Sequence, residues 1–239
     1  MGYFYDASYI LVLIGALLCF AASASVKSTY RRYLKERAAS GLTGAQTAAR
    51  ILENNGIRDV QIRQVAGELS DHYDPARKIV NLSPEVFNGD SIAAISIAAH
   101  ECGHVVQHET GYTPLNIRTA LVPAANIGSN VGLPMIVVGI FLENLLRGGG
   151  LGLLLAEVGV FAFALAVLFQ FVTLPVEFDA SNRALQMLGD YGILGADEGQ
   201  KAHKVLKAAA MTYVAATASS VLQLIRLLLI VRGNSRRRD

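Results

Sequence analysis

Residues 92–108 read IAAISIAAHECGHVVQH, and this stretch decides how the rest of the chain is interpreted. Small and branched apolar residues surround the motif HECGH at positions 100–104. Asp90 and Ser91, which precede the stretch, are residue types that cap the beginning of a helix. The pattern predicts a buried helix from about residue 92 to residue 108, with an ionisable triplet in its middle.

Histidines four residues apart lie one turn apart on the same face of a helix, so both imidazoles can reach one metal ion. Glu101 projects beside them, where it can activate a metal-bound water molecule. Two core histidines with an accidental Glu would leave an ionisable triplet unexplained inside an apolar helix. The spacing therefore predicts zinc bound by His100 and His104, with Glu101 as the general base.

Zinc needs a third protein ligand from another segment. The metzincin class is excluded because position 110 is Thr110 rather than His. His108 is two turns from His100, about 12 Å along a helix, which is too far to share one ion. We predict Glu177, because there the chain returns from a membrane hairpin to the side of the motif. Pro175 predicts that a helix begins at this point, which leaves a helix-start carboxylate as the alternative role.

Supporting roles around the zinc are less specific. Asp179 and Ser181 follow Glu177 closely and are candidates to orient a ligand histidine, although either can equally be a solvated residue. Tyr213 is a candidate donor to the oxyanion, in competition with His203 and Tyr191. Each of these assignments stays open at the level of the sequence.

Two other ionisable residues are set apart from the site. Glu157 precedes Glu177 by twenty residues, about 30 Å along a helix, so it is predicted not to join the zinc. Cys102 is two residues from His100 and points away from the metal, as a small buried residue does.

The remaining apolar residues indicate a membrane protein. Hydrophobic residues make up 52% of the 239 residues and charged residues 17%. Residues 7–26 carry no charge and can span a bilayer. The first nine residues lack the Lys or Arg of a signal peptide, so this run is predicted to stay as an anchor. Five basic residues follow between positions 27 and 37, which places this side in the cytoplasm.

Two further runs, residues 119–142 and 151–173, predict a transmembrane hairpin in which Pro123 and Pro134 kink the first helix. A last run, residues 208–231, contains Gln223 and Arg226. Four crossings would place the basic tail outside, so three crossings, with this last helix on or re-entering the inner face, are preferred over four.

The fold class expected is a mainly α integral membrane protein with a small α+β, gluzincin-like zinc domain. A helix over residues 43–55, a strand over residues 60–65 and a β-hairpin over residues 68–82 precede the motif helix. The predicted segments are an anchor (7–26), a catalytic part (27–118), a transmembrane hairpin (119–173), a third-ligand segment (174–207) and a last hydrophobic helix (208–231). A net charge of +2 gives no sign of nucleic acid as a partner, and two cysteines exclude a disulfide framework.

Three stretches carry a family resemblance: AAHECGHVVQH, LPVEFDASNRAL and KAAAMTYVAAT. Together with the hairpin between the first two, they resemble the YugP-like neutral zinc metallopeptidases of bacterial membranes over nearly the whole chain. A looser similarity is to the HtpX-like and CAAX-prenyl membrane proteases. Their pattern has Asp four residues after the third-ligand Glu, where this chain has Ser181, so Asp179 is the alternative partner of a ligand histidine.

The resemblance implies a multi-pass protein of the bacterial cell membrane that binds one Zn²⁺ per chain. With the residues above, it predicts an endopeptidase that hydrolyses membrane or membrane-proximal proteins at the cytoplasmic face. Peptide or protein substrates and the lipid bilayer are the expected partners, and the sequence identifies neither an adaptor nor an oligomeric state. The rival hypothesis is a non-catalytic membrane scaffold or sensor with a structural zinc site.

Overall fold

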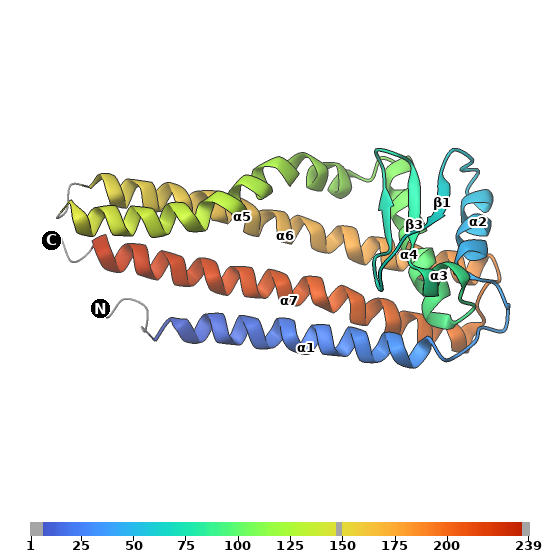
Figure 1. Cartoon of the computed structure of the whole chain (residues 1–239). Helices are drawn as coiled ribbons and strands as arrows, with labels where there is room; N and C mark the ends of the chain where they lie inside the picture. Colours follow the sequence, from blue (N-terminus) through green and yellow to red (C-terminus); the bar gives the residue numbers. More distant parts are fainter. Residues whose placement is uncertain (1–6, 147–149, 236–239) are drawn as a thin grey trace. The chain divides into compact units, whose positions relative to one another are not determined.

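The computed structural model describes residues 7–146 and 150–235, and these residues are mainly helical with one small sheet (Figure 1). This agrees with the coarse fold class predicted from the sequence. The elements in chain order are α1 (Tyr9–Tyr33), α2 (Gly44–Asn54), β1 (Gln61–Gln64), β2 (His72–Asp74), β3 (Ile79–Leu82), α3 (Pro84–Asn88), α4 (Ile92–Glu109), α5 (Thr113–Leu145), α6 (Leu151–Asp190) and α7 (Ala196–Ser235).

The described chain forms two compact units that alternate along the sequence. The bundle unit comprises the described residues within 1–21, 116–174 and 213–239. The mixed unit comprises residues 22–115 and 175–212, and it contains the sheet and the helix with the HECGH motif. The long helices α1, α5, α6 and α7 contribute residues to both units.

Local signals in the mixed unit explain its first elements. The Thr43 hydroxyl accepts a hydrogen bond from the Gln46 backbone N–H, and the Gln46 side chain accepts one from the Thr43 N–H. This reciprocal capping box fixes the beginning of α2. The predicted hairpin is present as β2 and β3, which pair antiparallel around the turn at residues 75–78. The strand predicted over residues 60–65 is β1, and it lies parallel to β3, so the strand order is β1-β3-β2.

The core of the mixed unit forms around α4. The Ser91 hydroxyl accepts a hydrogen bond from the Ala94 N–H and so caps this helix, as the sequence predicts. Residues of α4 then pack on α2, on β3 and on the ends of α6 and α7. The fully buried members of α4 include Ile95, Ala98, Ala99, Cys102 and Val105. Because α4 is held on so many sides, its side chains keep fixed positions.

Four helices of the structure are long and apolar enough to cross a membrane, namely α1, α5, α6 and α7. In the bundle unit, α5 and α6 approach closely through small residues. A methyl group added at Gly128 would lie 2.2 Å from the Ala162 carbonyl oxygen, and one at Gly132 would lie 3.0 Å from that of Gly159. The small residues therefore let the two helix backbones approach closely. Pro123 and Pro134 lie inside α5, which bends along its length (Figure 1).

The last helix, α7, packs against α1, α5 and α6 in the bundle unit. Ser219 of α7 lies against Gly15 of α1, and the Arg226 guanidinium lies 5.3 Å from the Tyr9 ring centre. Farther along, Leu227 and Val231 join the apolar cluster of α5 and α6. Within the bundle unit, α7 therefore runs antiparallel to the first part of α1. It is one of the four helices that are long and apolar enough to cross a membrane, and the number of crossings stays a prediction.

One expected helix boundary is wrong. Pro175 was predicted to lie in the first turn of a new helix, but it lies inside α6, which continues from the apolar run to Asp190. Proline removes one intrahelical hydrogen bond, and the helix continues because its flanks are held by packing. Val176 and Ala180, just beyond it, are both fully buried.

Candidate metal centre

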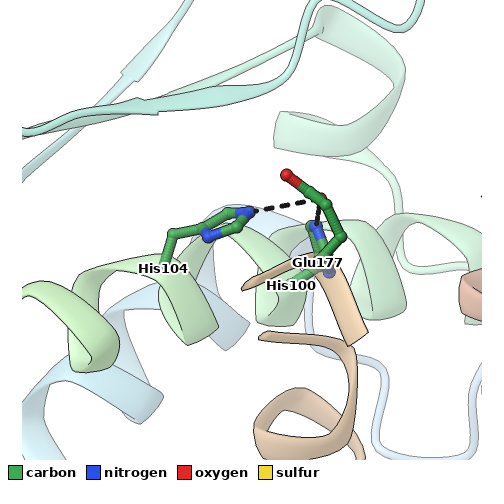
Figure 2. A group of neighbouring side chains, drawn as sticks. All are labelled: His100, His104 and Glu177. Carbon is green, nitrogen blue, oxygen red and sulfur yellow. Dashed lines mark ion pairs between the residues drawn. The ribbon is translucent and has the colours of Figure 1, made fainter. Parts of the chain in front are cut away.

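The two motif histidines come from one face of α4, and Glu177 reaches them from α6. Their ligand-type atoms all lie within 4.8 Å of one another. The Nε2 atoms of His100 and His104 are 3.4 Å and 3.6 Å from the same Glu177 carboxylate oxygen. Figure 2 shows both imidazoles pointing toward the carboxylate. The structure thus brings together the three residues predicted as zinc ligands.

A close helix contact makes this convergence possible. Gly103 of the motif faces Ala180 of α6, and a methyl group added at Gly103 would lie 2.5 Å from the Ala180 carbonyl oxygen. The absence of a side chain allows α6 to approach α4, so a carboxylate side chain bridges the gap. Glu177 is 3% exposed, which leaves its carboxylate inside the interface of the two helices.

The amide of Gln107 fixes the orientation of His104. Its nitrogen donates hydrogen bonds to the Val176 carbonyl and to the Asp179 carboxylate, both at 2.8 Å. Neither acceptor can donate a proton, so the amide oxygen must face the other way, toward Nδ1 of His104 at 3.0 Å. Nδ1 therefore carries the proton, and Nε2 presents its lone pair to Glu177.

Ser181 has the corresponding position beside His100. Its hydroxyl lies 3.2 Å from Nδ1 of His100. If the hydroxyl accepts the proton of Nδ1, Nε2 of His100 also presents a lone pair toward Glu177. Ser181 is 7% exposed and cannot exchange this contact freely for water. The residue at this position is the one that differs from the looser resemblance, and its hydroxyl nevertheless contacts a predicted ligand.

The donor set fits a cation. Two imidazole lone pairs and a buried carboxylate oxygen converge, and that Glu177 oxygen makes no hydrogen bond among the described residues. Such an arrangement is unfavourable unless a proton or a metal ion lies between the atoms. Burial by itself would lower the pKa of His104, but the Glu177 carboxylate and the Glu101 charge outweigh burial and raise it. Two His and one Glu are the ligands of a class of catalytic zinc sites that keep a fourth position open.

Asp179 was a candidate to orient a ligand histidine, but it does not contact one directly. Its carboxylate accepts hydrogen bonds from Gln107 and, at 2.6 Å, from Nε of Arg183. The Arg183 guanidinium also lies 5.5 Å from the ring centre of Tyr112. Asp179 therefore reaches His104 through Gln107, and Ser181 is the candidate that touches a predicted ligand directly.

The other sequence candidates lie in different surroundings. Glu101 is buried on α4 beside His100. Cys102 is fully buried, with its sulfur 3.8 Å from the Ala48 carbonyl oxygen, and burial raises the pKa of the thiol. Glu157 and Tyr213 belong to the bundle unit, so the oxyanion role of Tyr213 stays a prediction.

The remaining histidines lie at the surface or at the helix end. His108, near the end of α4, makes an edge contact with Tyr73 of β2 at 6.0 Å. His203 and His72 are exposed, whereas Tyr191 is half-buried and packs against the core of the mixed unit. None of these four side chains belongs to the group of converging ligand atoms.

Sequence reasoning missed Gln107 and Gly103 as contributors to the site. Gln107 stands three residues after His104, so it lies on the same helix face. The Gln107 amide is fully buried, and a buried amide needs hydrogen-bond partners. An amide residue within an apolar helix was therefore the signal that could have identified it. Gly103 stands inside the motif, and a glycine in the middle of a buried helix is costly unless another backbone approaches it.

Comparisons with known proteins agree with this geometry. The chain matches the family model described as putative neutral zinc metallopeptidase over residues 8–232. It is 45% identical over 223 residues to the protein named Putative membrane protease YugP of Bacillus subtilis (strain 168), covering 93% of this chain and 96% of that relative. No solved structure matches it significantly. The chain therefore belongs to the family of putative neutral zinc metallopeptidases.

Proposed function

We propose that this chain is a zinc-dependent endopeptidase of the gluzincin type. In this proposal His100, His104 and Glu177 hold one Zn²⁺, and Glu101 acts as the general base. The observation that carries the proposal is the convergence of two fixed imidazoles on a buried carboxylate oxygen that lacks a hydrogen-bond partner among the described residues. Three protein ligands leave one position for water or substrate, as in catalytic zinc sites.

The residues of the chain have separate tasks in peptide hydrolysis. When bound, zinc supplies Lewis-acid polarisation of the scissile carbonyl and lowers the pKa of a water molecule. Glu101 accepts the proton of that water and passes it to the leaving amine. Gln107 and Ser181 hold the two imidazoles in the orientation that keeps Nε2 available.

The sheet offers a place for an extended substrate. β2 is an edge strand in the order β1-β3-β2, and Tyr73 of β2 contacts His108 of the motif helix. An extended peptide can pair with such an edge by main-chain hydrogen bonds. Apolar helices confine the protein to the bilayer, so the substrates proposed are membrane or membrane-proximal proteins. The basic residues after the first apolar run support the cytoplasmic face as the side of the proposed site.

A structural zinc site in a membrane scaffold or sensor is the rival function. Structural zinc is usually held by four protein ligands, often thiolates. The group of converging ligand atoms among the described residues contains three members and no cysteine. A structural site also gives no reason for a buried glutamate beside the ligands. These features favour the catalytic proposal.

Replacing Glu101 with Gln tests the proposal. The general base is lost while all three ligands remain, so peptide hydrolysis should fall by about 10²–10⁴-fold with zinc still bound. The measurement combines cleavage of a fluorogenic peptide library with metal analysis of the purified full-length protein. Glu109→Gln on the same helix is the matched control and should leave both values unchanged, because Glu109 pairs with Lys78 at the helix end.

The two readouts separate the competing functions. Full hydrolysis in the Glu101→Gln variant would contradict the catalytic role of Glu101. Zinc at one ion per chain with no hydrolysis in either the wild-type protein or the variant would favour the scaffold function. Loss of zinc from the variant would mean that Glu101 maintains the site rather than moving a proton.

A further inference from the structure

A cavity lies in the mixed unit, between α6 and α7. Its volume is about 230 Å³. Phe178 and Leu185 of α6 and Leu206 of α7 form part of an apolar wall. Asn182, His203 and Lys207 also line it, so one small cavity combines apolar surface with an amide, an imidazole and an ammonium group. Ser181, which contacts His100, also lines the cavity, but the peptidase mechanism uses none of the six side chains named above.

The two basic side chains of this cavity have no partner among the described residues. His203 and Lys207 are four residues apart on α7 and therefore share one helix face. Within the part of the chain that the structure describes, neither forms a hydrogen bond or an ion pair, in contrast to Lys201, which pairs with Glu36 at 2.7 Å. No acidic residue is among the described residues that line the cavity. Its charge complementarity is therefore with an anion.

The cavity lies near the boundary between the apolar run and the more polar part of each helix. The apolar run of α6 ends just before Pro175, and Phe178 follows within the next turn. The apolar run of α7 begins at Ala208, directly after Lys207. If these helices cross a bilayer, the cavity lies at the level of the lipid headgroups. Basic pockets between membrane helices at this level bind anionic headgroups.

We propose that this cavity binds the phosphate headgroup of an anionic phospholipid. Lys207 supplies the positive charge, and His203 and Asn182 supply further hydrogen-bond donors to the phosphate oxygens. Phe178 and Leu206 contact the glycerol and the first acyl carbons. The apolar wall distinguishes this occupant from free phosphate, and the position next to two apolar helices distinguishes it from a soluble peptide.

Lipid binding can be measured without any reference to peptidase activity. The full-length protein in detergent is mixed with equal amounts of phosphatidylglycerol and phosphatidylcholine, and bound lipids are counted by native mass spectrometry. We expect the wild-type protein to retain phosphatidylglycerol preferentially. Lys207→Gln should reduce this preference about fivefold, the loss expected for one basic residue at an anionic lipid. Lys207→Arg should restore it.

Lys204→Gln is the matched control, because Lys204 is equally an exposed lysine of α7 but does not line the cavity. It should keep the preference, and thermal unfolding should show that all variants fold. Equal losses in the Lys204 and Lys207 variants would show general surface charge and overturn the proposal. Lack of preference in the wild-type protein, or full displacement of the lipid by inorganic phosphate, would also overturn it.

Discussion

Gln107 stands where many zinc sites have a carboxylate next to a ligand histidine. Its amide is fully buried and uses both N–H groups on α6, which leaves only its oxygen for His104. A neutral acceptor fixes the imidazole tautomer without adding negative charge to the site. The chain thus couples the orientation of one ligand to the backbone of the helix that carries the third ligand.

Replacing Gln107 with Leu should weaken zinc binding by about 10–100-fold, because the acceptor that orients His104 is lost while the apolar volume is kept. Competition with a chromophoric zinc chelator measures the dissociation constant. Nitrogen chemical shifts of the His104 imidazole should report the Nδ1–H tautomer in the wild-type protein and a mixture in the variant.

Gln186→Leu on α6 is the control, because that side chain is exposed. An unchanged zinc affinity in the Gln107 variant would show that His104 needs no orienting partner.

The spacing in HECGH predicts two ligands and a base, because four residues make about one helical turn. Glu177 follows from the need for a carboxylate on the same side of the membrane. Gln107 could not be assigned in this way, because its role depends on how close α6 comes, and a single sequence does not show that distance. For the same reason, the sequence could not decide whether Ser181 or Asp179 orients a ligand histidine. The structure shows that Ser181 contacts His100, whereas Asp179 contacts Gln107.

At the scale of elements, the contact between α4 and α6 controls the site. Gly103 and Ala180 allow the two backbones to approach, and Glu177 stands one turn before Ala180. The cap at Ser91 and the turn of the β-hairpin could be predicted from the sequence because these signals are local. The continuity of α6 through Pro175 could not be predicted, because packing against distant segments decides whether a helix continues past one missing hydrogen bond.

Replacing Gly103 with Ala should separate α4 from α6 and destabilise the protein by about 1–3 kcal/mol, as overpacking of a core does. Zinc affinity should fall as well, because Glu177 would move away from the imidazoles. Thermal unfolding and zinc titration measure the two effects.

Gly189→Ala is the matched control on α6, since a methyl group there would meet no atom within 4 Å. It should be neutral or slightly stabilising, because alanine favours a helix more than glycine does. A Gly103 variant with wild-type zinc affinity would show that the close approach of α4 and α6 does not position Glu177.

At the scale of the whole molecule, the packing of α7 bears on the number of membrane crossings. Charge counting places the arginine-rich tail inside, whereas contacts of Ser219 and Arg226 with α1 extend to Tyr9 at the beginning of that helix. Arg226, which argued against a crossing, lies against an aromatic ring in the bundle unit. Charge rules consider each segment alone and cannot include such a contact.

Reporter fusions should therefore place residues 40 and 190 in the cytoplasm and the C-terminus outside, because an α7 that runs antiparallel to α1 crosses wherever α1 does. Fusions after each position to a reporter active only inside and to one active only outside give two independent readouts. A cytoplasmic C-terminus would restore three crossings and contradict a spanning α7.

The central claim is that Glu177 completes a zinc site with His100 and His104. It is tested most directly by the zinc content of the purified full-length Glu177→Ala protein, compared with Glu157→Ala as the matched control and His104→Ala as the reference for a lost ligand. We expect about one zinc per chain in the wild-type protein and in the Glu157 variant, and nearly none in the other two, because two protein ligands hold zinc poorly. Stoichiometric zinc in the Glu177 variant would contradict the claim and place the third ligand elsewhere.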